Sequence, residues 1–140
     1  MKKLFVFAGL VVSLAACNKI EGEGGQGEIS GKLEINQILY VNSNPAGNVA
    51  VTAAAEDVYI VYGTEDEIYD DKIETNYDGT FKFKYLRPGT YTVFAYSEIF
   101  SQGANATNND DDYYYKVPVK VTVTVDKKGS VDVGTLSLTR

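Results

Sequence analysis

Residues 76–97, NYDGTFKFKYLRPGTYTVFAYS, decide the fold, because they place two turns between runs of alternating residues. Asp78-Gly79 predicts a tight turn, since glycine takes a positive φ at no cost and aspartate hydrogen-bonds to its own backbone. Pro88-Gly89 predicts a second turn. Around the turns, apolar residues alternate with lysine and threonine, which is typical of strands with one buried face. The residues predicted to point into the core are Phe81, Phe83, Tyr85, Tyr91, Val93 and Ala95.

The chain before this stretch shows the same period of two rather than the helical 3.6. A first strand is expected to bury Ile29, Gly31, Leu33 and Ile35. A bulge near residues 36–37 is expected to return Ile38 and Tyr40 to the core. Residues 42–56 are rich in Asn, Ala, Pro and Gly, so we expect a long loop with a short strand over 48–53.

The chain after this stretch is expected to add two more strands. Odd-numbered residues from 113 to 125 are Tyr or Val, which gives one long strand a core face. Pro118 lacks a backbone donor and therefore predicts an edge strand or a bulge. A last strand follows over 131–138, with a change of parity at Gly134. About seven strands result, which predicts an all-β fold, an immunoglobulin-like β-sandwich.

The first residues have the pattern of an export signal. Lys2 and Lys3 precede an apolar run from 4 to 14, which is shorter than the roughly 20 residues of a membrane span. Residues 14–17, LAAC, resemble the bacterial lipobox, which implies cleavage after residue 16 and a lipid, palmitate among its acyl chains, on Cys17. Several buried acyl chains hold a protein lastingly on a membrane.

The residue after the cysteine bears on which membrane holds the protein. In Gram-negative lipoproteins an aspartate there usually signals retention in the inner membrane, and here it is Asn18. We therefore expect an outer-membrane lipoprotein, facing either the periplasm or the cell surface. Glu21 and Glu23 resemble the surface-export signal of Bacteroidota lipoproteins.

The domain plan that follows is a signal peptide over 1–16, a lipidated cysteine with a flexible tether over 17–28, and one β-sandwich over 29–140. The tether is inferred from its Gly and Glu content. Its glycines satisfy G-x-G-x-x-G, but they precede a strand instead of following one and opening a helix, which excludes a dinucleotide site.

Composition limits the chemistry. The chain has 140 residues, a net charge of −6, one cysteine and no histidine. An acidic surface repels phosphates, so nucleic acid is not an expected partner. The chain also lacks Ser-His and Cys-His pairs and zinc ligand sets, so we expect no enzyme activity. A carboxylate pair acting on glycosides stays open, but that mechanism needs a deep cleft, which a domain of this size seldom provides.

The motif D-G-x-F-x-F-x-x-L-x-P-G-x-Y-x-V over 78–93 resembles carboxypeptidase regulatory-like domains, a branch of the transthyretin-like β-sandwiches. The resemblance covers residues 28–138, including the opening ISGKL over 29–33. It implies that the motif is scaffold and holds no catalytic residue. The chain departs from the family at 42–56 and 64–71. Transthyretin-like hydrolases use histidines for catalysis, and this chain has no histidine, so we do not expect that activity.

Two acidic groups suggest calcium. Asp110, Asp111 and Asp112 follow two asparagines and offer hard oxygen ligands, although without EF-hand spacing. The alternative is a solvated loop extended by charge repulsion. The acidic residues of 65–71 carry the same two interpretations. Calcium is the one cofactor that the sequence suggests.

Four residues predict a partner surface. If Val58 and Ile60 point inward, then Tyr59, Val61, Phe94 and Tyr96 point outward on neighbouring strands. Exposed aromatic patches mark partner surfaces, and aromatic rings also stack on sugars. The alternative is that the 42–56 insertion or residues 99–100 bury the patch. We expect an accessory or adhesion-like interaction module, or else a glycan-binding module.

Overall fold

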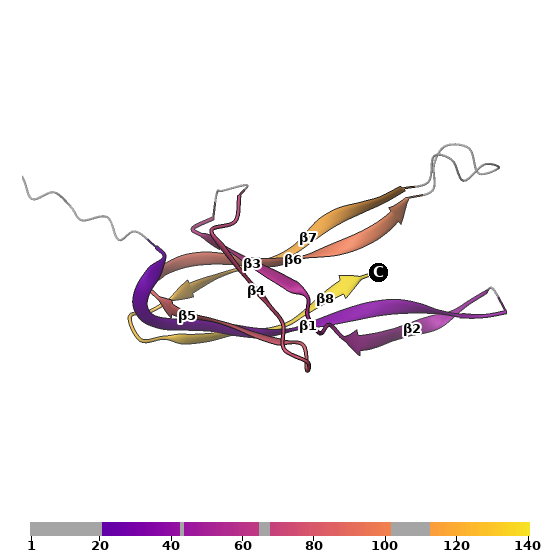
Figure 1. Cartoon of the computed structure of the whole chain (residues 1–140), viewed down its shortest axis with the longest axis horizontal. Helices are drawn as coiled ribbons and strands as arrows, with labels where there is room; N and C mark the ends of the chain where they lie inside the picture. Colours follow the sequence, from indigo (N-terminus) through magenta and orange to yellow (C-terminus); the bar gives the residue numbers. More distant parts are fainter. Residues whose placement is uncertain (1–20, 43, 65–67, 102–112) are drawn as a thin grey trace, which may run out of the picture.

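The computed structural model describes residues 21–42, 44–64, 68–101 and 113–140. There the chain forms an all-β sandwich of two sheets (Figure 1). The strands are β1 (Glu23–Val41), β2 (Asn44–Thr52), β3 (Asp57–Tyr62), β4 (Asp71–Glu74), β5 (Thr80–Leu86), β6 (Gly89–Ser101), β7 (Tyr113–Val125) and β8 (Ser130–Thr139). No helix in the described ranges is long and apolar enough to cross a membrane.

The first sheet is built around β1, which is 19 residues long. β1 pairs in parallel with β8 along one side. Its other side pairs antiparallel first with β5 and then with β2. The second sheet has the order β4-β3-β6-β7, so β7 is an edge strand, as Pro118 predicted.

The core lies between the two sheets and takes alternate side chains from each strand. Tyr91, Val93 and Ala95 are buried as predicted. Burial of one large apolar side chain contributes about 1.5–3 kcal/mol. The largest fully buried side chains are Tyr91, Ile29, Leu33, Ile60, Leu86, Leu138, Val58, Val93 and Val125.

The predicted tether is too long at its end, because β1 already begins at Glu23. Two glycines of this segment, Gly25 and Gly27, lie against other strands. A Cβ at Gly25 would lie 1.9 Å from the Leu86 carbonyl oxygen, and one at Gly27 would lie 2.3 Å from Val125 Cγ1. These glycines therefore serve close packing, and residues 23–28 belong to the sheet.

Two further predictions about β1 and its neighbour are wrong. Residues 44–52 form strand β2 rather than mostly loop, paired with the end of β1. The irregularity in β1 falls between Leu39 and Tyr40, not at 36–37. Ile38 and Tyr40 stay exposed, because β1 here has left the sandwich and no core lies beneath it.

Tyr85 also departs from the prediction. Its φ of 62° is in the left-handed region, and its side chain is exposed. The irregular backbone there changes the parity of the strand, so Leu86 is buried instead.

Two hairpins extend beyond the sandwich. The first, the β1–β2 arm, comprises 37–41 and 44–49; the second, the β6–β7 arm, comprises 97–101 and 113–117. Figure 1 shows that both project from the same end of the sandwich, opposite the end where β1 begins.

Candidate functional site

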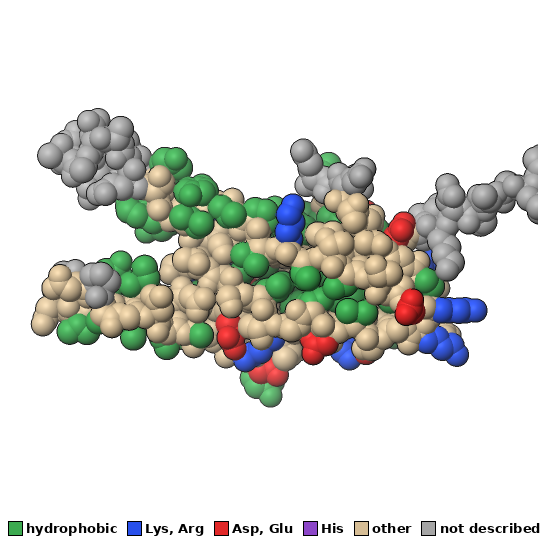
Figure 2. Space-filling view, turned by 180° about the vertical axis from the view of Figure 1, so that it is seen from behind, with side chains coloured by type: hydrophobic (Ala, Val, Ile, Leu, Met, Phe, Trp, Pro, Cys, Tyr) green, Lys and Arg blue, Asp and Glu red, His purple; other side chains and the backbone are tan. Residues whose placement is uncertain are grey.

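The space between the two arms forms a cleft of about 710 Å³. This volume is within the usual range for ligand sites, about 300–1,000 Å³. Figure 2 shows the hollow with hydrophobic side chains on both arms. We call it the inter-arm cleft, and its lining is Gln37, Ile38, Tyr40, Glu98, Ile99, Phe100, Tyr114, Thr139 and Arg140.

Exposed rings face the cleft from both arms. Tyr40 is 64% exposed on the β1–β2 arm, and Tyr114 is 72% exposed on the β6–β7 arm. The ring centroids of Phe100 and Tyr114 lie 5.3 Å apart, so these two rings support each other. Exposed rings gathered in one hollow are typical of a binding surface rather than of a folding core.

The floor of the cleft is the end of β8, and it links the two sheets. The backbone N–H of Thr139 donates to Ser97 Oγ over 3.0 Å. Arg140 pairs with Glu56 through both guanidinium Nη atoms, with Nη2 donating to Oε2 over 2.6 Å. The hydrogen-bonded carboxylate of Glu56 raises the pKa of Arg140, which keeps the guanidinium charged.

A smaller polar pocket of about 210 Å³ adjoins the cleft and shares Arg140 with it. Asp57 lies there, accepting hydrogen bonds from Tyr59 Oη over 3.1 Å and from Lys72 Nζ over 2.8 Å. Burial, followed by the bond to Asp57, raises the pKa of Tyr59. The hydroxyl of Tyr59 is therefore a fixed donor.

The predicted patch of Tyr59, Val61, Phe94 and Tyr96 is only partly correct. Tyr59 is paired with Phe94 across β3 and β6, as expected. Val61 is only 4% exposed and Phe94 only 8%, so neither offers a surface. The rings of Tyr59 and Tyr96 both pack against Phe94, at 5.1 and 5.4 Å.

The cover on this patch comes from its own rings and from the connection between β3 and β4. Tyr69 packs on Tyr59 with ring centroids 4.8 Å apart. The proposed alternatives, folding of 42–56 or 99–100 over the patch, do not describe the structure, because those segments build the two arms. Only Tyr59 and Tyr96 remain partly accessible, and both line the polar pocket beside Arg140.

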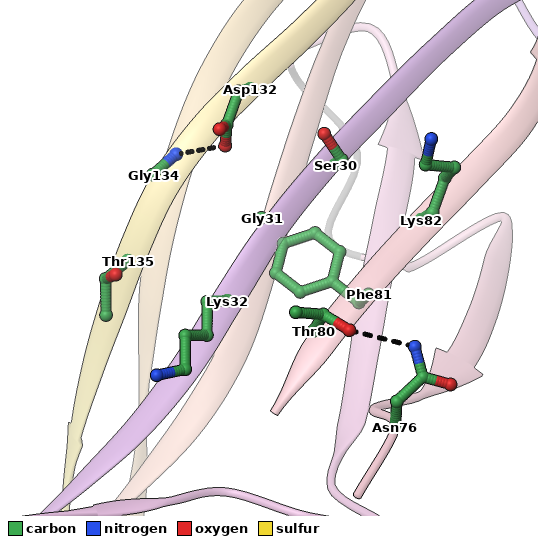
Figure 3. A pocket seen from close by; sticks show the side chains of 10 residues that line it. All are labelled: Ser30, Gly31, Lys32, Asn76, Thr80, Phe81, Lys82, Asp132, Gly134 and Thr135. Carbon is green, nitrogen blue, oxygen red and sulfur yellow. Dashed lines mark hydrogen bonds between the residues drawn. The ribbon is translucent and has the colours of Figure 1, made fainter. Parts of the chain in front are cut away.

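A further pocket of about 390 Å³ lies on the first sheet (Figure 3). Lys32 and Lys82 line it, but each is already paired, with Glu34 at 2.9 Å and Glu28 at 3.1 Å. Figure 3 shows the Phe81 ring beside Gly31, and this ring is buried. The pocket thus offers neither an unpaired lysine nor an exposed ring, so it is a weaker candidate than the cleft.

The predicted calcium ligands Asp110, Asp111 and Asp112 lie outside the described residues, as does Cys17. Of the second acidic group, Asp70 accepts a hydrogen bond from the Tyr62 N–H over 2.6 Å. Within the part of the chain that the structure describes, no group of three acidic, His or Cys side chains could hold a metal ion.

Sequence reasoning missed the inter-arm cleft, although two signals for it exist. No charged residue occurs between Glu34 and Glu56, in a chain with 23% charged residues. Three consecutive tyrosines occupy 113–115, where strict alternation would call for polar residues. Both features mark strands that leave the core but keep apolar surface.

Comparisons with known proteins show the fold. No protein-family model matches the chain, and no curated protein sequence matches it. A solved structure of a "putative carbohydrate binding protein" from Pseudomonas aeruginosa is similar, with a TM-score of 0.52 and 17% identity over 86% of this chain and 92% of that chain. A 9R-lipoxygenase from Cyanothece matches at a TM-score of 0.36 and 12% identity, over 79% of this chain and 16% of that chain. At such identities the first likeness establishes the β-sandwich architecture alone, and the second adds nothing to it.

Proposed function

We propose that the protein is a non-enzymatic binding module, held on the outer membrane by a lipid on Cys17, that binds a glycan in the inter-arm cleft. One observation carries the proposal: exposed aromatic rings from both arms line a hollow whose floor holds a fixed guanidinium. The rings supply apolar faces, and Gln37, Glu98 and Arg140 supply polar groups at the same site.

The chemistry of this lining suits a sugar. A sugar ring has an apolar C–H face and a rim of hydroxyls, so it needs flat apolar contacts together with donors and acceptors. Tyr40 and Tyr114 each combine an aromatic face with a hydroxyl. Gln37 both donates and accepts, Glu98 accepts, and Arg140 donates in a plane.

Charge favours a neutral glycan over an anionic one. The chain carries a net charge of −6, which repels anionic polysaccharides. Arg140 is already neutralised by Glu56. The similar structure from Pseudomonas aeruginosa, that of a "putative carbohydrate binding protein", supports the proposal of a glycan ligand.

The placement of the cleft supports an anchored binding role. Cys17 precedes the start of β1 by only six residues, and the arms project from the end of the sandwich opposite that start (Figure 1). The cleft would therefore face away from the membrane. This holds for either side of the outer membrane, periplasmic or external.

The carboxylates of the cleft support the proposal of a binding role without catalysis. Glycoside hydrolysis generally needs two carboxyl groups flanking the bond. Among the described residues that line the cleft, Glu98 is the single carboxylate. Glu56 is close to Arg140 but is engaged by it in an ion pair.

We also propose that the domain is of the carboxypeptidase regulatory-like kind. Gly79 has the positive φ, 78°, that the D-G turn of the motif requires. Tyr91 of the motif is buried, and its hydroxyl donates to the Arg87 carbonyl over 2.7 Å. In this view the motif of 78–93 is scaffold, and the arms are additions to it.

The test is binding of the full-length protein to an array of neutral and anionic glycans, with affinities measured by calorimetry. Replacing Tyr40 and Tyr114 together by Ala removes about 1 kcal/mol per ring, so we expect binding to weaken roughly 30-fold. The matched control is Tyr77→Ala, which removes an exposed ring outside the cleft.

Two outcomes would overturn the glycan proposal. One is no binding to any glycan on the array. The other is binding that the Tyr40→Ala, Tyr114→Ala variant leaves unchanged. Loss of a defined protein partner with the same variant would instead indicate an adhesion-like role for the cleft.

A further inference from the structure

β2 is an edge strand with one side open. β8 occupies one side of β1, and β5 and β2 follow each other along the opposite side. Within the described residues, β2 pairs with β1 and with no other strand. Its outer backbone groups therefore face solvent as a row of free donors and acceptors.

The other strands that run along sheet edges carry features that block pairing. Natural proteins use charges, proline, bulges and short length for this purpose. β4 has only four residues, three of them charged. The blocking features of the others are Lys82, Lys84 and the irregular Tyr85 in β5, Lys116, Pro118 and Lys120 in β7, and Asp132 and the positive-φ Gly134 in β8.

β2 lacks these features along its inner half. Pro45 and Gly47, whose φ is 151°, interrupt the strand near its tip. The remaining residues, 48–52, have the sequence NVAVT, with no charge and no proline. Asn48, Ala50 and Thr52 are exposed. This segment is an open edge with β-branched residues and nothing that opposes another strand.

We propose that residues 48–52 of β2 pair antiparallel with the same residues of a second copy, so that the first sheets of two molecules join into one. Self-pairing about a two-fold axis at Ala50 sets Val49 opposite Val51 of the second copy, and Asn48 opposite Thr52. Like charges directly opposite each other are destabilising, so a strand that pairs with itself must be neutral.

Charge selects this edge for contact between copies. Each molecule carries a net charge of −6, so two copies repel each other over most of their surfaces. The segment from 35 to 55 has no charged residue and includes all of β2. Two copies therefore meet with little charge repulsion at this edge.

The pairing leaves the inter-arm cleft free. Residues of β1, β6, β7 and the end of β8 line the cleft, and no residue of β2 does. A five-residue strand pair is smaller than a standard interface, which buries about 1,200–2,000 Å². Confinement to one membrane raises the effective concentration of the copies, and this favours a weak contact there.

Disulfide trapping tests the proposal in cells that export the full chain. Opposed residues in antiparallel strands have Cα atoms about 4.5–5.5 Å apart, which matches disulfide geometry. Ala50→Cys should give a disulfide-linked dimer under mild oxidation. Thr124→Cys, an exposed position on the edge strand β7 four residues after Lys120, is the matched control, and the unchanged chain controls for Cys17.

The expected result is a dimer with Ala50→Cys and none with either control. Absence of a dimer, or equal dimer yields from Ala50→Cys and Thr124→Cys, overturns the proposal. Glycan affinity should be the same in Ala50→Cys and the unchanged chain, because no residue of β2 lines the cleft. Failure of the dimer and failure of glycan binding are thus separate results.

A charge exchange gives a second test. Ala50→Lys and Ala50→Glu should each abolish association of the protein with itself, because each places like charges opposite one another. Their mixture should associate, since opposite charges then meet across the axis. The proposal is overturned if the mixture behaves like either variant alone in chemical cross-linking of the full-length protein in intact membranes.

Discussion

At the scale of the residue, Tyr91 ties the start of the chain to the sandwich. Its ring is fully buried, and its hydroxyl accepts from the Gly22 N–H over 3.0 Å while donating to the Arg87 carbonyl. Burial raises the pKa of Tyr91, which keeps the hydroxyl protonated as a donor. A single phenol thus satisfies two backbone groups that no strand pairing reaches.

Tyr91→Phe should lower the free energy of unfolding by about 1–3 kcal/mol, because the Gly22 N–H and the Arg87 carbonyl lose their partner. Chemical denaturation monitored by circular dichroism measures this change. Tyr77→Phe is the control, since that ring is 90% exposed and should give no change. Equal stability of the Tyr91→Phe variant and the unchanged protein would contradict the role assigned to the hydroxyl.

The sequence revealed which residues are buried where alternation is regular. Tyr91, Val93 and Ala95 follow an uninterrupted strand, so parity alone placed them correctly. Tyr85 broke the rule because its positive φ changes the parity, and a non-glycine residue gives no warning of that. The sequence places Phe94 on the correct face, but its burial depends on the rings of Tyr59 and Tyr96, which no local pattern specifies.

At the scale of the element, β1 shows why composition misjudged a boundary. Gly25 and Gly27 favour a flexible segment by composition, yet both lie where another chain segment passes too close for a side chain. Glycine serves flexibility and close approach equally well. Only the packing partners, Leu86 and Val125, distinguish these two uses, and they lie far along the sequence.

Gly25→Ala should destabilise the protein strongly, by more than about 2 kcal/mol, because the added Cβ meets backbone that cannot move aside cheaply. Gln26→Ala, at an exposed position between the two glycines, should be nearly neutral. Melting temperatures of the two variants measure these changes in stability. If both are neutral, residues 23–28 behave as a tether after all.

The two arms also show that local composition does not determine which residues form a strand. The Asn, Pro and Gly of residues 42–56 suggest turns and predict a loop with a short strand over 48–53, whereas β2 begins at Asn44 and pairs with β1 beyond the core. The cleft needs both arms at one end of the sandwich, and this depends on how the two sheets are stacked. Sheet stacking is a property of the whole fold and cannot be derived from any single segment.

At the scale of the whole molecule, stability depends on pH, because a surface carboxylate in each sheet has a lowered pKa in the folded state. Hydrogen bonds from Lys82 and then Ser130 lower the pKa of Glu28, and Lys72 lowers that of Asp57. A carboxyl group with a lowered pKa in the folded state binds protons more readily when unfolded. Its stabilisation is complete above the unfolded pKa of about 4 and is lost as the pH falls.

We expect the urea midpoint of unfolding to decrease from about pH 5 to about pH 3, as protonation removes these bonds. Lys72→Met removes the partner of Asp57 and should flatten part of this decrease. A midpoint that rises on acidification would contradict the assignment. The measurement needs only fluorescence or circular dichroism at several pH values.

The two-stranded construction of the arms has a mechanical consequence. A lone ribbon has no second layer to brace it and bends more easily than a sandwich. The floor of the inter-arm cleft is fixed, because Thr139 is hydrogen-bonded to Ser97 and Arg140 to Glu56. The distance between the two arms can thus adjust to ligands of different thickness, while the depth to which a ligand enters the inter-arm cleft stays constant.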